Sequence, residues 1–190
     1  GFQHFTTSRT AIVAALMLAP FGTAGTAQAE VCLIDTNNTG TANTGDTTVG
    51  ATNENPENGG TLACGPNART NGQNTTAVGA NAFARSDGVA IGNDTEGSFF
   101  SVAVGASARA TDESATAVGA FARADERSAA FGSGADATPE ESTALGTFAT
   151  AGGEGAVAVG YDAETQSAYG VAVGFEARAG GAAIAIGANA

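Results

Sequence analysis

The chain has 190 residues, of which 43% are hydrophobic and 28 are glycine, and its formal net charge is −12 at pH 7. The basic side chains are seven arginines and His4, too few and too dispersed for the clustered cations that bind nucleic acid, so we expect no nucleic-acid partner. Without lysine, and with the one histidine near the N-terminus, the repeats offer no Ser-His or Cys-His pair for nucleophilic catalysis, and paired carboxylates are weak candidates for acid–base catalysis. We therefore predict that the protein is not an enzyme and has no catalytic site, cofactor or metal.

Residues 1–29 have the three parts of an export signal. Arg9 supplies the positive charge, residues 11–19 form an apolar run, and Ala27-Gln28-Ala29 is a small-x-small cleavage site. The apolar run is shorter than the roughly 20 residues that span a membrane. We predict that residues 1–29 are a signal peptide and that the protein is exported. A buried N-terminal helix is the alternative.

Residues 30–61 differ in composition from the rest of the chain. Glycine, asparagine, threonine and aspartate dominate residues 35–60, and few large apolar residues occur there. This composition is typical of irregular structure. We predict an N-terminal cap, or degenerate coils, that closes the end of the repeat array that follows.

Cys32 and Cys64 are the two cysteines of the sequence. In an exported protein, a pair of cysteines favours a disulfide. A Cys32–Cys64 bridge would attach the segment around Cys32 to the start of the repeats. Pairing between chains and two unpaired cysteines are the alternatives.

From residue 62 to residue 190, one short phrase recurs every 13–14 residues, and its clearest copy is residues 101–110. A glycine marks each copy. Alanine lies two residues before every marker and three residues after it, except that Thr95 replaces the second alanine in one copy. The ten markers, which we predict to be turn glycines, are Gly65, Gly79, Gly92, Gly105, Gly119, Gly132, Gly146, Gly160, Gly174 and Gly187.

A period of 13–14 residues is too short for a helical-pair repeat or a propeller blade. It is long enough for two short strands and two tight turns, which form one coil of a solenoid. Apolar residues alternate with small ones, and a glycine in every copy would cost a helix about 1 kcal/mol each. The sequence therefore predicts an all-β fold, a parallel β-roll or β-solenoid of about ten coils.

Both faces of the first strand in each copy are apolar. In residues 102–104, Ala103 points to one face, and Val102 and Val104 point to the other. We expect the alanines inside the coil and the larger residues outside, where they would form a stripe too large for a soluble monomer and so favour self-association. The alternative is a monomer with the faces reversed. The apolar row before the markers is Val78, Ile91, Val104, Val118, Phe131, Leu145, Val159, Val173 and Ile186.

The phrase Ser-Val-Ala-Val-Gly-x-x-Ala-x-Ala, repeated over residues 62–190, resembles the head repeat of YadA-like trimeric autotransporter adhesins. The resemblance implies a left-handed β-roll, and a homotrimer with one hydrophobic face of each roll along its axis. It also implies display at the cell surface, on the outer membrane of a Gram-negative bacterium. Family members carry a stalk and an anchor, so we expect a head fragment whose link to the membrane is a missing C-terminal anchor. A protein that is anchored in another way is the alternative.

Three further groups of side chains recur in the repeats. We expect the acidic pairs Asp112/Glu113, Asp125/Glu126 and Glu140/Glu141 to form a solvated ladder at the turns, in preference to a metal or catalytic site. We expect the arginines to form a broken row on one outer face, for charge balance or, alternatively, as a ligand groove; these are Arg69, Arg85, Arg109, Arg123 and Arg178. We expect the phenylalanines to extend the trimer interface or to make adhesive contacts; these are Phe83, Phe121, Phe148 and Phe175.

The function that these patterns favour is that of an adhesin head. It would attach to host cells, extracellular matrix or other surfaces through many weak contacts that act together. The alternative is a non-adhesive structural spacer or fibre segment of a cell-surface protein. An enzyme built on a β-helix is disfavoured, because such enzymes use longer coils and catalytic residues that this sequence lacks.

Overall fold

The computed structural model describes residues 30–31, 52–53 and 60–190. The predicted signal peptide (1–29), Cys32 and most of the predicted cap (30–61) lie outside the described residues. The signal, the cap and the Cys32–Cys64 disulfide therefore stay predictions. Within the part of the chain that the structure describes, no helix has the length and hydrophobicity to cross a membrane.

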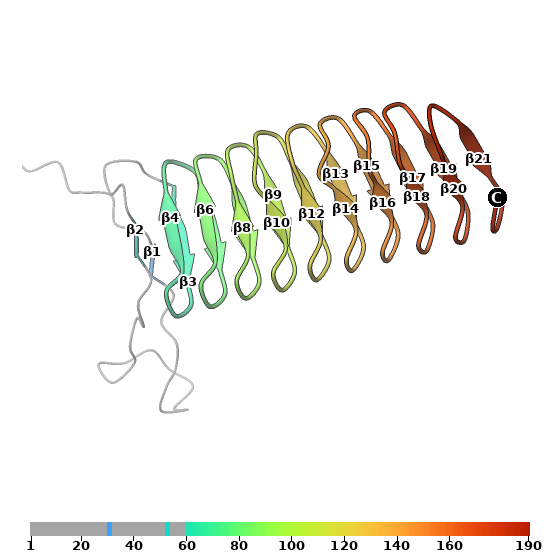
Figure 1. The fold of residues 1–190 in the computed structure, drawn as a ribbon. Helices are drawn as coiled ribbons and strands as arrows, with labels where there is room; N and C mark the ends of the chain where they lie inside the picture. Colours follow the sequence, from blue (N-terminus) through green and yellow to red (C-terminus); the bar gives the residue numbers. More distant parts are fainter. Residues whose placement is uncertain (1–29, 32–51, 54–59) are drawn as a thin grey trace, which may run out of the picture.

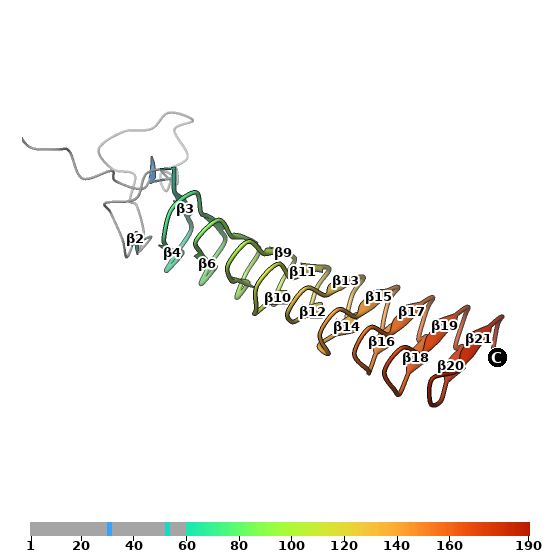
Figure 2. The same cartoon turned by 90° about the horizontal axis from the view of Figure 1, so that it is seen from above.

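Two parallel sheets run the length of the molecule (Figure 1). The chain alternates between them, so that odd-numbered strands build the first sheet and even-numbered strands build the second. Between residues 60 and 190 it completes nine coils and adds the first strand of a tenth. Figure 2 shows these coils stacked one after another into a rod. The predicted all-β parallel solenoid with coils of about 14 residues is confirmed.

All described strands are two or three residues long. The first sheet contains β1 (Glu30–Val31), β3 (Leu62–Cys64), β5 (Thr76–Val78), β7 (Val89–Ile91), β9 (Val102–Val104), β11 (Thr116–Val118), β13 (Ala129–Phe131), β15 (Thr143–Leu145), β17 (Val157–Val159), β19 (Val171–Val173) and β21 (Ile184–Ile186). The second sheet contains β2 (Thr52–Asn53), β4 (Arg69–Asn71), β6 (Phe83–Arg85), β8 (Glu96–Gly97), β10 (Arg109–Ala110), β12 (Arg123–Ala124), β14 (Asp136–Ala137), β16 (Thr150–Ala151), β18 (Glu164–Thr165) and β20 (Arg178–Ala179).

The coils stack in register, so equivalent residues form columns along the rod. Val104 of β9 pairs with Val118 of β11, and Ala103 pairs with Ala117. The difference between coils of 13 and 14 residues falls in the turn that leads from the second sheet back to the first. That turn has four residues between β4 and β5, and three between β6 and β7. Because the turns absorb the difference, the strands keep their register.

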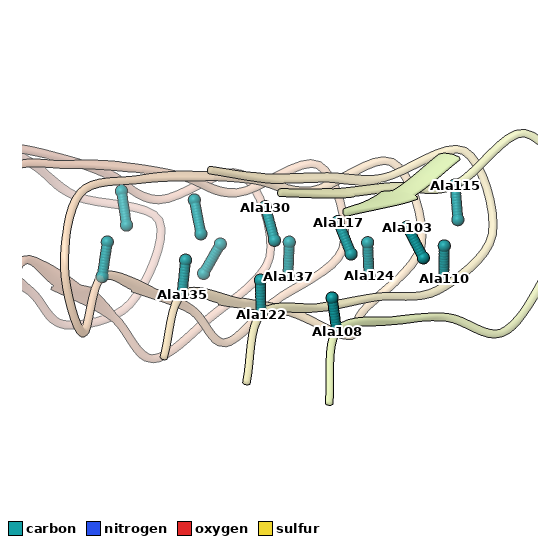
Figure 3. Close-up of a cluster of buried hydrophobic side chains, with 14 of the residues drawn as sticks. Ala103, Ala108, Ala110, Ala115, Ala117, Ala122, Ala124, Ala130, Ala135 and Ala137 are labelled. Atoms are coloured by element: carbon teal, nitrogen blue, oxygen red, sulfur yellow. The ribbon is translucent and has the colours of Figure 1, made fainter. Parts of the chain in front are cut away.

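The core of the solenoid consists almost entirely of alanine. Alanines from the first sheet face alanines from the second sheet across the interior (Figure 3), and the sixteen members of the central cluster are at most 1% exposed. Opposing walls this close leave room for small side chains only, which is why the larger apolar residues are excluded. The predicted facing is therefore correct, with alanines inside and larger apolar residues outside. The reversed arrangement is wrong.

Serine and threonine replace alanine at some core positions because the backbone satisfies most of their hydroxyl groups. Ser101 Oγ donates to the carbonyl oxygen of Ser98 (2.9 Å), and Ser142 Oγ donates to that of Pro139 (2.6 Å). Thr95 Oγ1 donates to the Gly105 carbonyl oxygen in the next coil (3.1 Å). A hydroxyl group with a partner can be buried at little cost.

The marker glycines occupy turns that other residues cannot adopt without strain. All ten have φ between 126° and 144°. In addition, a Cβ atom added to Gly105 would lie 2.5 Å from the carbonyl oxygen of Gly119, its equivalent in the next coil. Glycine is therefore required both by backbone conformation and by the close approach of successive coils.

We predict that Gly105→Ala destabilises the protein by about 2 kcal/mol or more, because the strained φ and the clash with Gly119 act together. The control is Gly180→Ala. Gly180 does not have a positive φ, and a Cβ added there has no atom within 4 Å. This control should change stability by no more than about 0.5 kcal/mol. Urea denaturation followed by circular dichroism measures both variants, and equal midpoints would contradict the prediction.

Candidate interaction surfaces

The outer face of the first sheet is an apolar surface that runs along the rod, which we call the apolar face. Two columns of side chains form it, and each strand contributes its first and third residue, such as Val102 and Val104 in β9. All nine residues of the predicted apolar row lie on this face, and none belongs to the alanine core. Leu145 is 47% exposed there, and Ile91 is 39% exposed. Thr76, Thr116 and Thr143 interrupt the first column, whereas the second column is apolar from β5 to β21, and a long apolar surface of this kind marks a candidate interaction site.

Aromatic side chains gather at the turns that follow the strands of the first sheet. Phe121, Phe148, Tyr161 and Phe175 form this group, which we call the aromatic ledge, and they are 48–65% exposed. The rings of Tyr161 and Phe175 stack with centroids 5.3 Å apart, and Phe148 meets Tyr161 edge to face at 6.2 Å. Tyr161 was not singled out in the sequence, although it occupies the same repeat position as Phe175. Phe83 does not belong to this ledge, because it lies on β6 in the second sheet.

The predicted acidic ladder forms only in part. Backbone hydrogen bonds stack the turns that carry Glu113, Glu126, Glu140 and Glu154. Asp125 lies apart from this column and accepts a hydrogen bond from Thr111 Oγ1 (2.7 Å). Within residues 60–190, no group of three or more acidic, histidine or cysteine side chains is arranged to hold a metal. The side chains of Glu113, Glu140 and Glu154 are exposed, so the acidic turns form a solvated surface.

Arg127 neutralises part of this acidic surface, and sequence reasoning missed it. Its guanidinium forms ion pairs with Glu126 (2.6 Å), Glu141 (3.2 Å) and Glu140. All four side chains are about half exposed, so these pairs contribute little individually to stability. The signal that could have revealed Arg127 is its position beside Glu126 in a turn that stacks directly below Glu141.

The arginines of the second sheet form a row with one displaced member. Arg69, Arg109, Arg123 and Arg178 each begin an even-numbered strand, whereas Arg85 ends β6. The register places Asn71, and not Arg69, beside Arg85. The expected single row is therefore corrected: Phe83 occupies the position of the arginine in that coil, and Arg85 lies two residues further along the strand.

Some of these arginines are paired with acids, and others are not. Glu96 lies between Arg109 (3.0 Å) and Arg85 (3.9 Å), and Arg178 contacts Glu164 (3.3 Å). Arg69 and Arg85 lie over the ring of Phe83, at 4.6 Å and 5.0 Å from its centroid. Among the described residues, no acidic group lies within ion-pair distance of Arg123. Charge balance with neighbouring acids therefore explains the positions of some arginines in the row but not of all of them.

Two hollows on the second sheet form one groove, which we call the arginine groove. Ser107 and Arg109 line both hollows, so the two are continuous. The larger hollow has a volume of about 460 Å³. The complete lining is Arg69, Asn81, Phe83, Arg85, Asp94, Thr95, Glu96, Ser107, Arg109, Phe121 and Arg123.

A hydrogen bond to a carboxylate changes the acidity of one tyrosine. Tyr169 Oη donates to Glu154 Oε1 (3.2 Å), and this bond, together with the negative charge of Glu154, raises the pKa of Tyr169 above 10.0. Because the neutral phenol is the favoured form, the stabilising contribution of this pair is present below pH 10 and is lost as the pH rises through the titration of Tyr169.

We predict that Glu154→Gln lowers the pKa of Tyr169, because the substitution removes the charge that opposes phenolate formation. The measurement is an ultraviolet titration in a Tyr161→Phe background, where Tyr169 is the one remaining tyrosine. Glu176→Gln in the same background is the control, since Glu176 is not among the groups that shift Tyr169. An unchanged midpoint in Glu154→Gln would show that the hydrogen bond does not form in solution.

Comparison with known families agrees with this geometry. The model of the YadA head domain repeat matches residues 59–82, 100–122, 126–149 and 151–177, which together make up about half of the chain. A comparison with curated protein sequences gives no significant match. Heads of this kind are typically adhesin-type domains of surface-exposed bacterial autotransporters and not enzymes. The chain therefore belongs to the YadA head domain repeat family.

Proposed function

We propose that this chain is the head of a surface-displayed adhesin, which attaches to host cells, extracellular matrix or other surfaces. One observation carries the proposal: the outer surface repeats coil by coil, and it presents exposed aromatic and charged side chains in columns along a rigid rod. Such a surface suits many weak contacts with a repetitive target, whose affinities combine through effective concentration.

The proposal includes a homotrimer, assembled with the apolar faces toward the common axis. Heads of this family are usually trimeric. The apolar face supports the same arrangement here, since burying Val, Ile, Leu and Phe side chains stabilises an assembly by about 25 cal/mol for each Å² of apolar area removed from water. A trimer also presents each column of exposed aromatic and charged side chains three times.

The proposal places the head at the cell surface of a Gram-negative bacterium. Export through a signal peptide at residues 1–29 and attachment through a C-terminal anchor beyond the head are parts of it. So is a Cys32–Cys64 disulfide, which would join the cap to β3, the strand that ends at Cys64. No catalytic step, cofactor or metal is part of the proposed function.

The second candidate function is a non-adhesive spacer. The observation that favours it is the regularity of the rod itself, because a solenoid of this kind supplies length whether or not it binds anything. The two functions differ in one measurable respect. An adhesin binds a surface saturably, and a spacer does not.

We predict saturable retention of the purified chain on epithelial cell monolayers or on plates coated with extracellular matrix extract. Labelled protein is applied over a range of concentrations, and the retained amount is measured after washing. Serum albumin on the same surfaces is the control for non-specific retention. Retention that rises linearly without saturation, as for albumin, would favour the spacer.

We further predict that Val118→Glu/Val159→Glu weakens this retention at least tenfold, because carboxylates on the apolar face prevent assembly and so remove multivalency. Thr138→Glu/Thr150→Glu is the matched control. It adds the same charge outside the apolar face, in the turn that follows β14 and on β16. Circular dichroism verifies that both variants fold. Equal retention of the two variants would contradict a role for the apolar face.

A further inference from the structure

We infer that the arginine groove binds a linear acidic polysaccharide. The inference rests on the proposed adhesive function and names its ligand class and its site. The groove follows the rod axis from β4 to β12, which corresponds to four steps of about 4.8 Å, or about 19 Å in total. A polymer lying along the rod would meet the same kind of side chain at each step.

The groove concentrates positive charge in an otherwise acidic protein. Four of the six arginines that follow residue 29 line it, against two acidic side chains, Asp94 and Glu96. Beyond the groove the column of Arg109 and Arg123 continues with Asp136, Thr150, Glu164 and Arg178, so adjacent arginines do not recur there. A negatively charged ligand is therefore attracted most strongly to the groove.

Arg109 and Arg123 give the strongest indication of an anionic ligand. They are direct neighbours in the parallel register of β10 and β12, so two guanidinium groups lie side by side on the same face. Like charges at such positions destabilise a sheet. Glu96 offsets the charge of Arg109, and Asp136 is the neighbour of Arg123 in the next strand, but among the described residues no acidic side chain lies within ion-pair distance of Arg123. A carboxylate or sulfate bound between them would neutralise both groups.

The aromatic side chains fit a sugar polymer. The ring of Phe83 holds the guanidinium groups of Arg69 and Arg85 against it, which fixes the direction of both donors. Phe121, at the other end of the groove, is 65% exposed and offers its apolar face to a sugar ring. One surface thus offers guanidinium groups, which can bind an acidic group through two parallel hydrogen bonds, and an exposed aromatic ring, which can stack on the apolar face of a sugar.

The remaining polar groups distinguish a polysaccharide from a nucleic acid. Asp94 is oriented by a hydrogen bond from Asn81 Nδ2 (2.7 Å), and together with Glu96 and Ser107 it can accept hydrogen bonds from sugar hydroxyl groups. These carboxylates would repel duplex DNA, whose charges recur about every 1.7 Å along its axis. The arginines of the groove are spaced by whole coils, so they match a ligand with sparser charge and many hydroxyl groups.

The test measures binding of the full chain to polygalacturonate, dextran sulfate and uncharged dextran by isothermal titration calorimetry. We expect both acidic polymers to bind and dextran not to bind, with affinity that falls as salt concentration rises. Arg109→Gln/Arg123→Gln should weaken binding at least tenfold. The matched control is Arg127→Gln/Arg178→Gln, which removes the same charge outside the groove and should stay within twofold of the wild type.

Several results would overturn the inference. They are no binding of either acidic polymer by the wild-type chain, equal losses in the two double variants, or tighter binding of duplex DNA than of the polysaccharides. Surface retention of the same proteins separates this inference from the proposed function. If the wild-type chain is retained saturably but binds no acidic polymer, the groove assignment is wrong and adhesion stands. If the chain binds the polymers through the groove but is retained on no surface, the proposed function is wrong and the groove stands.

Discussion

The structure depends on how closely successive coils and opposing walls approach one another. Across the interior there is room for small side chains only, so Ala103, Ala117 and their equivalents fill most of it, with serine or threonine at the remaining positions. At the turn, the carbonyl oxygen of one marker glycine occupies the space that a Cβ on the preceding marker would need. Alanine and glycine are therefore set by distance and not by hydrophobicity. An interior that accepts only small side chains places every large apolar side chain on the outside.

This outward placement explains why the outer faces of the two sheets differ in chemical character. The first sheet presents valine, isoleucine, leucine and phenylalanine and suits contact with other copies of the chain. The second sheet carries charged and polar side chains that remain available to a ligand, with the arginine groove at its N-terminal end and a mixture of acidic residues, threonine and Arg178 beyond it. The aromatic ledge lies at the turn between the two sheets, and Phe121 belongs both to it and to the groove. In a trimer built on the apolar face, the groove and the ledge would be presented on all three sides.

The sequence predicts the strands and the core well, because each copy repeats the same steric requirement. A strict alanine two residues before glycine has one simple explanation, a narrow coil, and the structure agrees. Side chains near the turns were predicted less well. The number of residues in the turn after the second sheet varies between coils, so neighbours there, such as those of Arg127, cannot be counted from the marker glycine. Arg85 is a different case: it lies six residues after its marker glycine, whereas the other arginines of the row lie four residues after theirs. Which arginines find acidic partners depends on side-chain geometry across three coils, and the periodic pattern does not contain that information. The number of chains in the assembly depends on contacts between chains, which the repeat pattern of one chain does not specify.

The central claim is that the apolar face of the solenoid is covered by other copies of the same chain. Sedimentation equilibrium of the purified wild-type chain tests it most directly. The account predicts a single species with the mass of three chains that persists on dilution. A folded species with the mass of one chain, stable over the same range of concentration, would contradict it, because the apolar face would then remain in water without cover.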